Sequence, residues 1–567
     1  MPNVSLELIE EAFIAPIRFA LLVDDQFPIY SKIVDKAPAA SQDSDRAAKL
    51  FNFCRGKGWL CDVDNGASDK DQERISHLHQ SDLLVVDFHL DPAKQEDPAR
   101  ALQILQQLAQ SEHMNLVIIY TAAEPPSVVQ EVAFSLGAGV TLDADKFKNG
   151  VQWLEDLDPD IERTISVQLN TAVLDNFLYG KKPNGDSNAL RKAIQEAGAA
   201  TGDLQNLVIN VLCQLAMETR VTPDVVARRA KQQGARVSFG KKDESFWVTQ
   251  GNVFVVVVNK QDEPAVLVER LRSALVAWNP PALQVMMVHA RAALERAGRL
   301  PDEKVLESSR RQAGWILRIL LGETAEIRRT HLQELYDRIF GRLVNTISTS
   351  ISEFGSKVFE PMAGVTPLLQ AATMAGDESL NEIVVFHALN EHLCSEPHVD
   401  DYISTGVVFR SLINGTWDYW VCSSPACDLV PGQATGWDGE MKPLLPITAA
   451  RLNPIRQSVT VGTLLQDATH CRHLFLSEGG KPIALEIVDS KSRQMRLEMM
   501  LVEKEGRIEN ASFSARVLRV DGDGKPTTNN VDFEVVGMLR KDYANRILAE
   551  SGQQRARIGV DYVNRPR

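Results

Sequence analysis

Long hydrophobic runs are absent from this chain of 567 residues. The most apolar stretch, residues 253–258, has the length of a strand, and no run approaches the roughly 20 residues that a membrane helix needs. The first residues, Met1 to Glu7, have neither the basic start nor the apolar core of a secretory signal peptide. We therefore expect a cytoplasmic protein without a membrane partner.

Cysteines are also few, and the chain has no net positive charge. Seven scattered cysteines, an odd number, are typical of a reducing compartment and not of a disulfide framework. The formal net charge is −14, which excludes a broad basic field for nucleic acid. The helix expected at residues 221–230 carries basic side chains, but no recognition helix follows it. We expect no nucleic-acid partner.

Three common catalytic motifs are missing. The chain contains no GxxxxGK[ST] loop, no GxGxxG after a strand and no GxSxG. These absences remove the usual nucleotide-binding and serine-hydrolase signatures, and we do not expect an enzyme, although residues 380–567 leave this question open.

Three buried strands that end on polar residues are the main positive feature. The run at residues 19–23 ends on Asp24 and Asp25, the run at 83–86 ends on Asp87, and the run at 116–120 ends on Thr121. In an open parallel sheet the functional groups gather at the carboxyl ends of the strands. Because carboxylates brought together repel one another, the sequence predicts a cation among them, and an all-oxygen set favours Mg²⁺.

The order of these residues resembles the receiver domain of two-component response regulators. The resemblance implies an acid pair at Asp24 and Asp25, a phosphoacceptor at Asp87, and Thr121 followed by Ala122 at the end of the fourth strand. It also implies a lysine at the end of the fifth strand, for which Lys146 is the candidate, after a Gly137-Ala138 turn and a short strand near residues 140–142. Phosphatases of the haloacid dehalogenase type use similar residues in a different order.

The resemblance implies a signalling function. A partner histidine kinase would transfer a phosphoryl group to Asp87, with Mg²⁺ on Asp24, Asp25 and Asp87 and with Thr121 and Lys146 on the phosphoryl oxygens. The large remainder is similar to receiver proteins of Detocs-type antiphage systems, in which one receiver drives an effector protein and another buffers phosphate. Alternatively, the receiver is degenerate and only docks a partner.

The predicted fold class is multidomain, α/β plus α+β. Alternating strands and helices over residues 1–150 indicate a flavodoxin-like, doubly wound, five-stranded parallel receiver. A helical linker domain is expected at 151–240, a helix-rich α+β domain at 241–375 and a β-rich domain at 376–567.

A second candidate metal site lies in the β-rich part. Cys422 and Cys427 are followed at a distance by His470, Cys471 and His473, which could make a metal-dependent output enzyme. The Cys-x4-Cys spacing is wider than the common zinc spacing, and adjacent ligands at 470 and 471 are awkward for one tetrahedral ion. Small buried thiols in a β-core are the alternative.

Overall fold

The computed structural model divides the chain into two compact units, residues 1–297 with 349–360 and residues 298–348 with 361–567. The described residues are 4–28, 44–64, 78, 81–90, 97–111, 114–199, 201–229, 236–297, 308–322, 324–413, 415–430, 436, 438–455, 461–466, 473–478, 481–488, 494–520 and 522–556.

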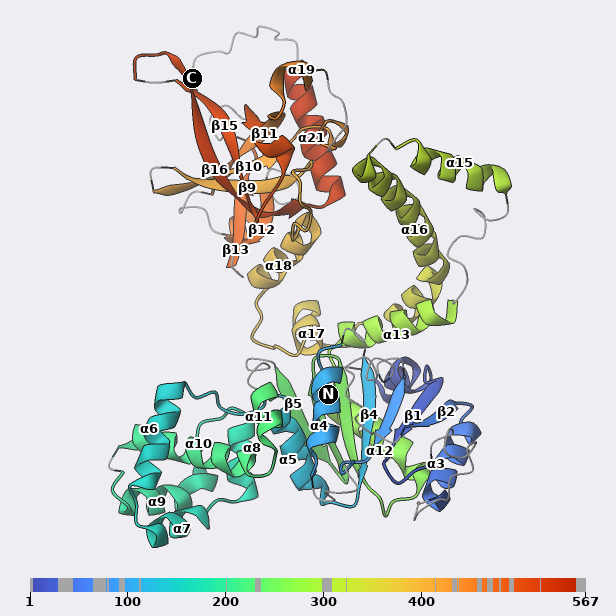
Figure 1. Ribbon diagram of the computed structural model, residues 1–567, viewed down its shortest axis with the longest axis vertical. Coiled ribbons are helices and arrows are strands. Elements are labelled where there is room, and N and C mark those ends of the chain that lie inside the picture. Colours follow the sequence, from blue (N-terminus) through green and yellow to red (C-terminus); the bar gives the residue numbers. More distant parts are fainter. Residues whose placement is uncertain are drawn as a thin grey trace. The chain divides into compact units, whose positions relative to one another are not determined.

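The first unit is built on a mixed sheet with the strand order β2-β1-β3-β4-β7-β6-β5 (Figure 1). The five parallel strands are β2 (Leu60–Asp64), β1 (Phe19–Val23), β3 (Leu83–Val86), β4 (Asn115–Thr121) and β7 (Val253–Asn259). Antiparallel strands β6 (Ser245–Gln250) and β5 (Val237–Lys242) extend the sheet beyond β7. The flavodoxin-like architecture is confirmed, with two more strands than predicted.

Helices cover the sheet because its central strands are apolar on both faces. All residues of β3 and β4 are buried, as expected for parallel strands covered on both sides. Helices α4 (Ala99–Leu108) and α5 (Pro125–Ser135) contact each other, and α3 (Ser44–Gly56) contacts α12 (Pro264–Trp278). Proline at the first positions of α5 and α12 suits a helix start, where its missing N–H costs nothing.

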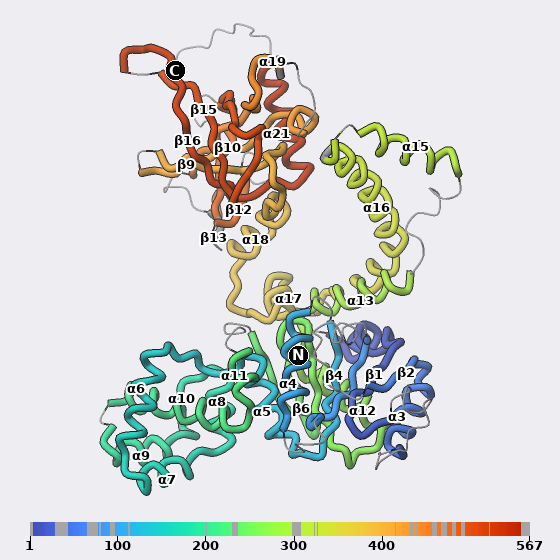
Figure 2. The backbone as a smooth tube through the Cα atoms, in the orientation of Figure 1, coloured from blue at the N-terminus to red at the C-terminus, as the bar shows by residue number. Residues whose placement is uncertain are grey.

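A helical insertion separates α5 from the last strands of the sheet (Figure 2). Its α-helices are α6 (Ala144–Glu155), α7 (Pro159–Ser166), α8 (Thr171–Leu178), α9 (Asn188–Glu196), α10 (Gly202–Glu218) and α11 (Pro223–Arg229). Arg229 is buried and donates hydrogen bonds to the carbonyl oxygens of Phe134 and Ala138, both at 2.9 Å. The insertion is therefore tied to the carboxyl end of α5.

The fifth parallel strand lies far from where the sequence suggested it. Residues 140–142 form no strand; they lead to Asp143, which accepts a hydrogen bond from the Lys146 N–H and caps α6. The strand beside β4 is β7, which the sequence analysis had placed in a separate domain. The predicted boundaries at 150 and 240 therefore do not coincide with this sheet, which runs to residue 259.

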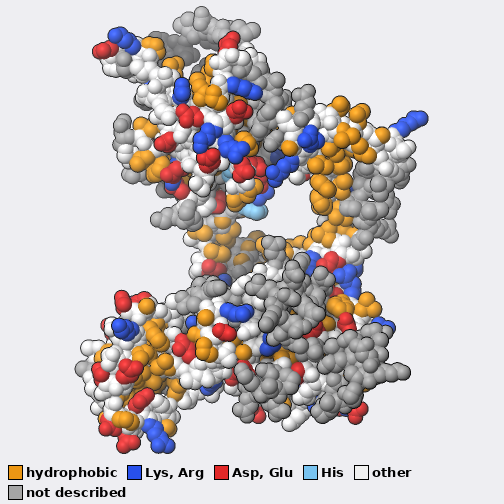
Figure 3. All heavy atoms as spheres, in the orientation of Figure 1, with side chains coloured by type: hydrophobic (Ala, Val, Ile, Leu, Met, Phe, Trp, Pro, Cys, Tyr) orange, Lys and Arg blue, Asp and Glu red, His pale blue; other side chains and the backbone are white. Residues whose placement is uncertain are grey.

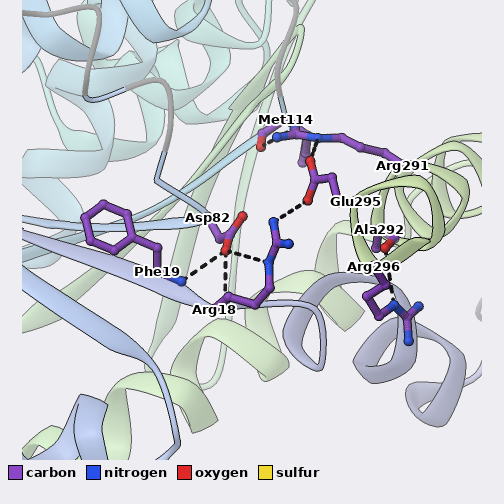
Figure 4. Close-up of polar contacts among 8 residues, drawn as sticks. All are labelled: Arg18, Phe19, Asp82, Met114, Arg291, Ala292, Glu295 and Arg296. Atoms are coloured by element: carbon purple, nitrogen blue, oxygen red, sulfur yellow. Dashed lines mark hydrogen bonds and ion pairs between the residues drawn. The ribbon is translucent and has the colours of Figure 1, made fainter. Parts of the chain in front are cut away.

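Helix α13 (Ala282–Ala297) is fastened to the amino-terminal edge of the sheet (Figure 4). Glu295 accepts hydrogen bonds from Arg18 and Arg291, both at 2.7 Å. Arg291 also donates to the Met114 carbonyl oxygen at 3.3 Å, and Asp82 accepts from the backbone N–H groups of Arg18 and Phe19. These contacts join α13 to the residues that begin β1, β3 and β4.

The helix-rich middle contains α15 (Ser309–Leu320), α16 (Ala325–Val358), α17 (Pro367–Met374) and α18 (Glu382–Cys394). Figure 3 shows apolar side chains at the surface of α15 and α16, where Leu320 and Phe340 are among the exposed residues. Helix α16 belongs to both units, because residues 349–360 cluster with the first. None of the described helices is long and apolar enough to cross a membrane.

The second unit ends in a β-rich domain, as predicted. Its sheet closes because β10 (Thr416–Cys422) pairs with both β9 (Val407–Ile413) and β11 (Leu445–Pro454). The other strands are β8 (Ser395–Glu396), β12 (His473–Glu478), β13 (Lys481–Glu486), β14 (Arg496–Val502), β15 (Ser512–Val520) and β16 (Pro526–Leu539). Its core holds the rings of Phe409, Trp420, Phe513 and Phe533, which contact one another in stacked and edge-to-face pairs. Helix α21 (Lys541–Ala556) packs on a second cluster.

Candidate metal centre

Neighbouring parallel strands bring the predicted residues to one edge of the sheet. Val23 at the end of β1 pairs with Val86 at the end of β3, so Asp24 and Asp87 follow side by side. The Asp87 N–H donates to the Val23 carbonyl oxygen at 2.8 Å, and the Asp24 N–H donates to the Asp64 carbonyl oxygen at 3.0 Å. These bonds continue the ladder past the strand ends and fix both aspartates.

Asp24, Asp25 and Asp87 form one acidic cluster. Each offers a carboxylate oxygen, and these atoms lie within 4.8 Å of one another. Asp24 and Asp87 are buried, with 4% and 7% of their surface exposed. Among the described side chains, this is the group of three or more His, Cys, Asp or Glu residues whose geometry could hold a metal ion.

Lys260 is the cation of the cluster. Its Nζ lies 2.7 Å from Asp87 Oδ2 and 3.2 Å from Asp24 Oδ2. The side chain is 10% exposed and follows β7 directly, so the fifth parallel strand delivers a lysine to the edge that carries the aspartates.

Thr121 lies at the same edge, at the end of β4, and is fully buried. Its carbonyl oxygen accepts a hydrogen bond from the Lys260 N–H at 2.7 Å, which locks β4 to the residue after β7. Its Oγ1 accepts from the Ala123 N–H at 3.1 Å. The hydroxyl proton is therefore available to an acceptor at the carboxyl edge of the sheet.

Burial makes the ionised form of Asp24 costly. The pKa of Asp24 is raised to about 6 by desolvation and by the charge of Asp87, although Lys260 and the Gln26 N–H act in the opposite direction. Three carboxylates lie together in the cluster, and the Lys260 ammonium group contacts two of them. Carboxylate oxygens are the ligands that Mg²⁺ prefers. The donor set therefore fits Mg²⁺.

Lys146 lies elsewhere, and its prediction as the lysine after the fifth strand is wrong. It sits in the first turn of α6, its Nζ is 2.8 Å from Asp143, and 67% of the side chain is exposed. Lys260 occupies the expected position. The sequence carried a signal for it, since Val253 to Val258 is a fully apolar run that ends in Asn259 and Lys260, as the other site strands end in polar residues.

The second candidate site does not assemble among the described residues. Cys422 is fully buried in β10, Cys427 is exposed in the short helix Ala426–Asp428, and His473 begins β12. His470 and Cys471 lie outside the described part of the chain. Burial raises the pKa of the Cys422 thiol to about 12, as expected for a small side chain in the core.

Comparison with protein families identifies the domain that carries the acidic cluster. Residues 16–170 match the family model of the response receiver domain. The N-terminal part of the chain is a response receiver domain. The match contains Asp24, Asp25, Asp87 and Thr121 and ends within the insertion, so the strand that completes the receiver sheet, β7, lies beyond it. Comparisons with curated proteins and with solved structures gave no match.

Proposed function

We propose that the receiver domain accepts a phosphoryl group on Asp87 from a phosphohistidine of a partner histidine kinase, with Mg²⁺ held by Asp24, Asp25 and Asp87. The observation that carries the proposal is the convergence of Asp87 with two other carboxylates and with Lys260 at 2.7 Å. When bound, Mg²⁺ would supply positive charge for the transferring group.

Asp87, Lys260 and Thr121 would have separate roles in the phosphoryl transfer. An Asp87 carboxylate oxygen attacks phosphorus, and the bond between phosphorus and the kinase imidazole breaks, so that an acyl phosphate forms. Lys260, which contacts Asp87 and Asp24, would move onto the new phosphoryl oxygens. The Thr121 hydroxyl would donate to a further phosphoryl oxygen.

The test uses the full chain with acetyl phosphate as donor. In millimolar MgCl₂ the intact mass should rise by one phosphoryl group, and chelation with EDTA should prevent the gain. Asp87→Asn should abolish it, whereas Asp156→Asn, a substitution at the carboxyl end of α6, should not. A gain that persists in Asp87→Asn, or no gain in any condition, would refute the proposal.

We further propose that the phosphorylated receiver acts in bacterial antiphage defence, as a regulator or a phosphate buffer. The resemblance to Detocs-type receiver proteins and the absence of a DNA-reading motif support this role. Wild type and Asp87→Asn, each expressed with the neighbouring genes, should differ in phage plating efficiency. Equal plating would contradict the role in defence and leave the phosphorylation chemistry intact.

The alternative is a degenerate receiver that only docks a partner. The presence of Lys260, supplied by β7 and in contact with Asp87, makes a degenerate site the weaker interpretation. We therefore prefer the phosphorylated receiver.

A further inference from the structure

The turn that carries Lys260 is held from behind by Tyr120. The Tyr120 hydroxyl donates to the Asp262 carbonyl oxygen at 2.7 Å and lies 3.2 Å from the Lys260 carbonyl oxygen. The tyrosine is 4% exposed and comes directly before Thr121 in β4. Because successive side chains of a strand point to opposite faces, Tyr120 reaches the turn while Thr121 stays at the site edge.

Further hydrogen bonds hold the backbone of this turn. The Lys260 N–H donates to the Thr121 carbonyl oxygen at 2.7 Å, the Asp262 N–H donates to the Asn259 carbonyl oxygen at 3.0 Å, and the Gln261 N–H donates to Asn259 Oδ1. Tyr120 adds the link from the β4 side chain to both carbonyls of the turn. The backbone that bears Lys260 is thereby fixed to the strand that bears Thr121.

We propose that Tyr120 is a positioning residue, whose hydroxyl fixes Lys260 for phosphoryl transfer to Asp87. The inference rests on the proposed function. Tyr120 acts through the backbone of residues 260–262, so its loss displaces the ammonium group without removing a carboxylate from the acidic cluster. Phosphorylation therefore depends on the hydroxyl, whereas Mg²⁺ binding does not.

The test compares two tyrosine-to-phenylalanine substitutions in the full chain. Tyr120→Phe should slow phosphorylation by acetyl phosphate at saturating Mg²⁺ by about tenfold. Its Mg²⁺ affinity, measured by calorimetry, should stay within about twofold. Tyr179→Phe is the matched control, since that hydroxyl donates to the Phe239 carbonyl oxygen at 2.9 Å, and it should leave both quantities unchanged.

A double-mutant cycle separates positioning through Lys260 from a general loss of stability. In the background of Lys260→Ala, Tyr120→Phe should have no further effect on the rate. Wild-type rates in Tyr120→Phe, or an equal slowing in both backgrounds, would overturn the proposal. Absence of phosphorylation in the unsubstituted chain is the separate failure of the proposed function, and the role of Tyr120 falls with it.

Discussion

At the scale of single residues, the acidic cluster combines buried carboxylates with one lysine. Lys260 contacts Asp24 and Asp87, and both aspartates are buried. Two predictions follow from the charges at this scale, one for the lysine and one for the most strongly perturbed acid.

Removal of Lys260 should destabilise the metal-free protein. Lys260→Met leaves Asp24 and Asp87 without their cation, and the loss of one partner of a buried ion pair costs about 3 kcal/mol or more. The free energy of unfolding in urea with EDTA measures this cost. Lys146→Met is the matched control, because that side chain is exposed, and it should change stability by less than about 0.5 kcal/mol. Equal effects of the two substitutions would contradict the assignment.

Asp24→Asn should stabilise the metal-free protein at neutral pH. The folded pKa of Asp24 is about 6 and its ordinary value is 3.8, so the stability contributed by this group is full below pH 4 and is lost as pH rises through 6. At pH 7.5 with EDTA the substitution should therefore gain about 2–3 kcal/mol, and the gain should fall to about half at pH 5. Thermal or urea unfolding at both pH values gives the comparison. A loss of stability at pH 7.5 would show that the Asp24 charge is favourable there.

Sequence reasoning found the site residues at the ends of β1, β3 and β4, which are strands close to one another in the sequence. Asp24, Asp25, Asp87 and Thr121 each end a short apolar run, and the sheet brings them to one edge, as parallel strand order requires. Lys260 was missed because the insertion places it far beyond α5, and a helix-capping pair, Asp143 and Lys146, lay where the family lysine was sought.

At the scale of elements, helices and strands could be predicted from the local hydrophobic pattern. The pairing of strands distant in the sequence could not. The alternating strands and helices over residues 1–150 and the strand-length run at 253–258 follow from local pattern. Tertiary packing decides that β7 pairs with β4. The sequence of a buried apolar strand is the same whether the strand joins a parallel sheet or a hairpin of another domain.

The attachment of the insertion should depend on Arg229. Its buried guanidinium donates to the carbonyl oxygens of Phe134, in the last turn of α5, and of Ala138, just after it, and lies over the Phe134 ring, 4.2 Å from its centre. Arg229→Ala leaves both carbonyls without this donor and should reduce the free energy of unfolding by about 2–4 kcal/mol. Arg228→Ala, at the neighbouring and less buried position, should cost under 1 kcal/mol. Similar urea midpoints for the two variants would refute this account.

At the scale of the whole molecule, α13 and the end of α16 belong with the receiver. Phe354 of α16 stacks on His289 of α13 with ring centres 3.9 Å apart, and Lys357 lies 3.4 Å from Glu11. Helix α16 also contributes residues to the second unit. The end of α16 is therefore held in the first unit through its contact with α13.

The hold of α13 should weaken when Glu295 is removed. Glu295→Ala deletes the acceptor shared by Arg18 and Arg291, and because these groups are partly exposed the loss should be about 1 kcal/mol, or about fivefold in local opening. Hydrogen exchange of the α13 amides should accelerate by that factor, with the β3 and β4 amides unchanged. Arg296→Ala is the control, because Arg296 donates to the Ala292 carbonyl oxygen of its own helix at 3.2 Å (Figure 4). Unchanged exchange in α13 would contradict the role of the network.

The central claim is that phosphorylation occurs on Asp87, beside Lys260, and it is tested most directly by locating the modified residue. The full chain is treated with acetyl phosphate and Mg²⁺, and the acyl phosphate is reduced with borohydride, which converts the carrier aspartate to homoserine. Peptide mass spectrometry should find homoserine at position 87 in the wild type and none in Lys260→Ala under the same brief exposure. Homoserine at another aspartate, or equal conversion in both proteins, would contradict the account.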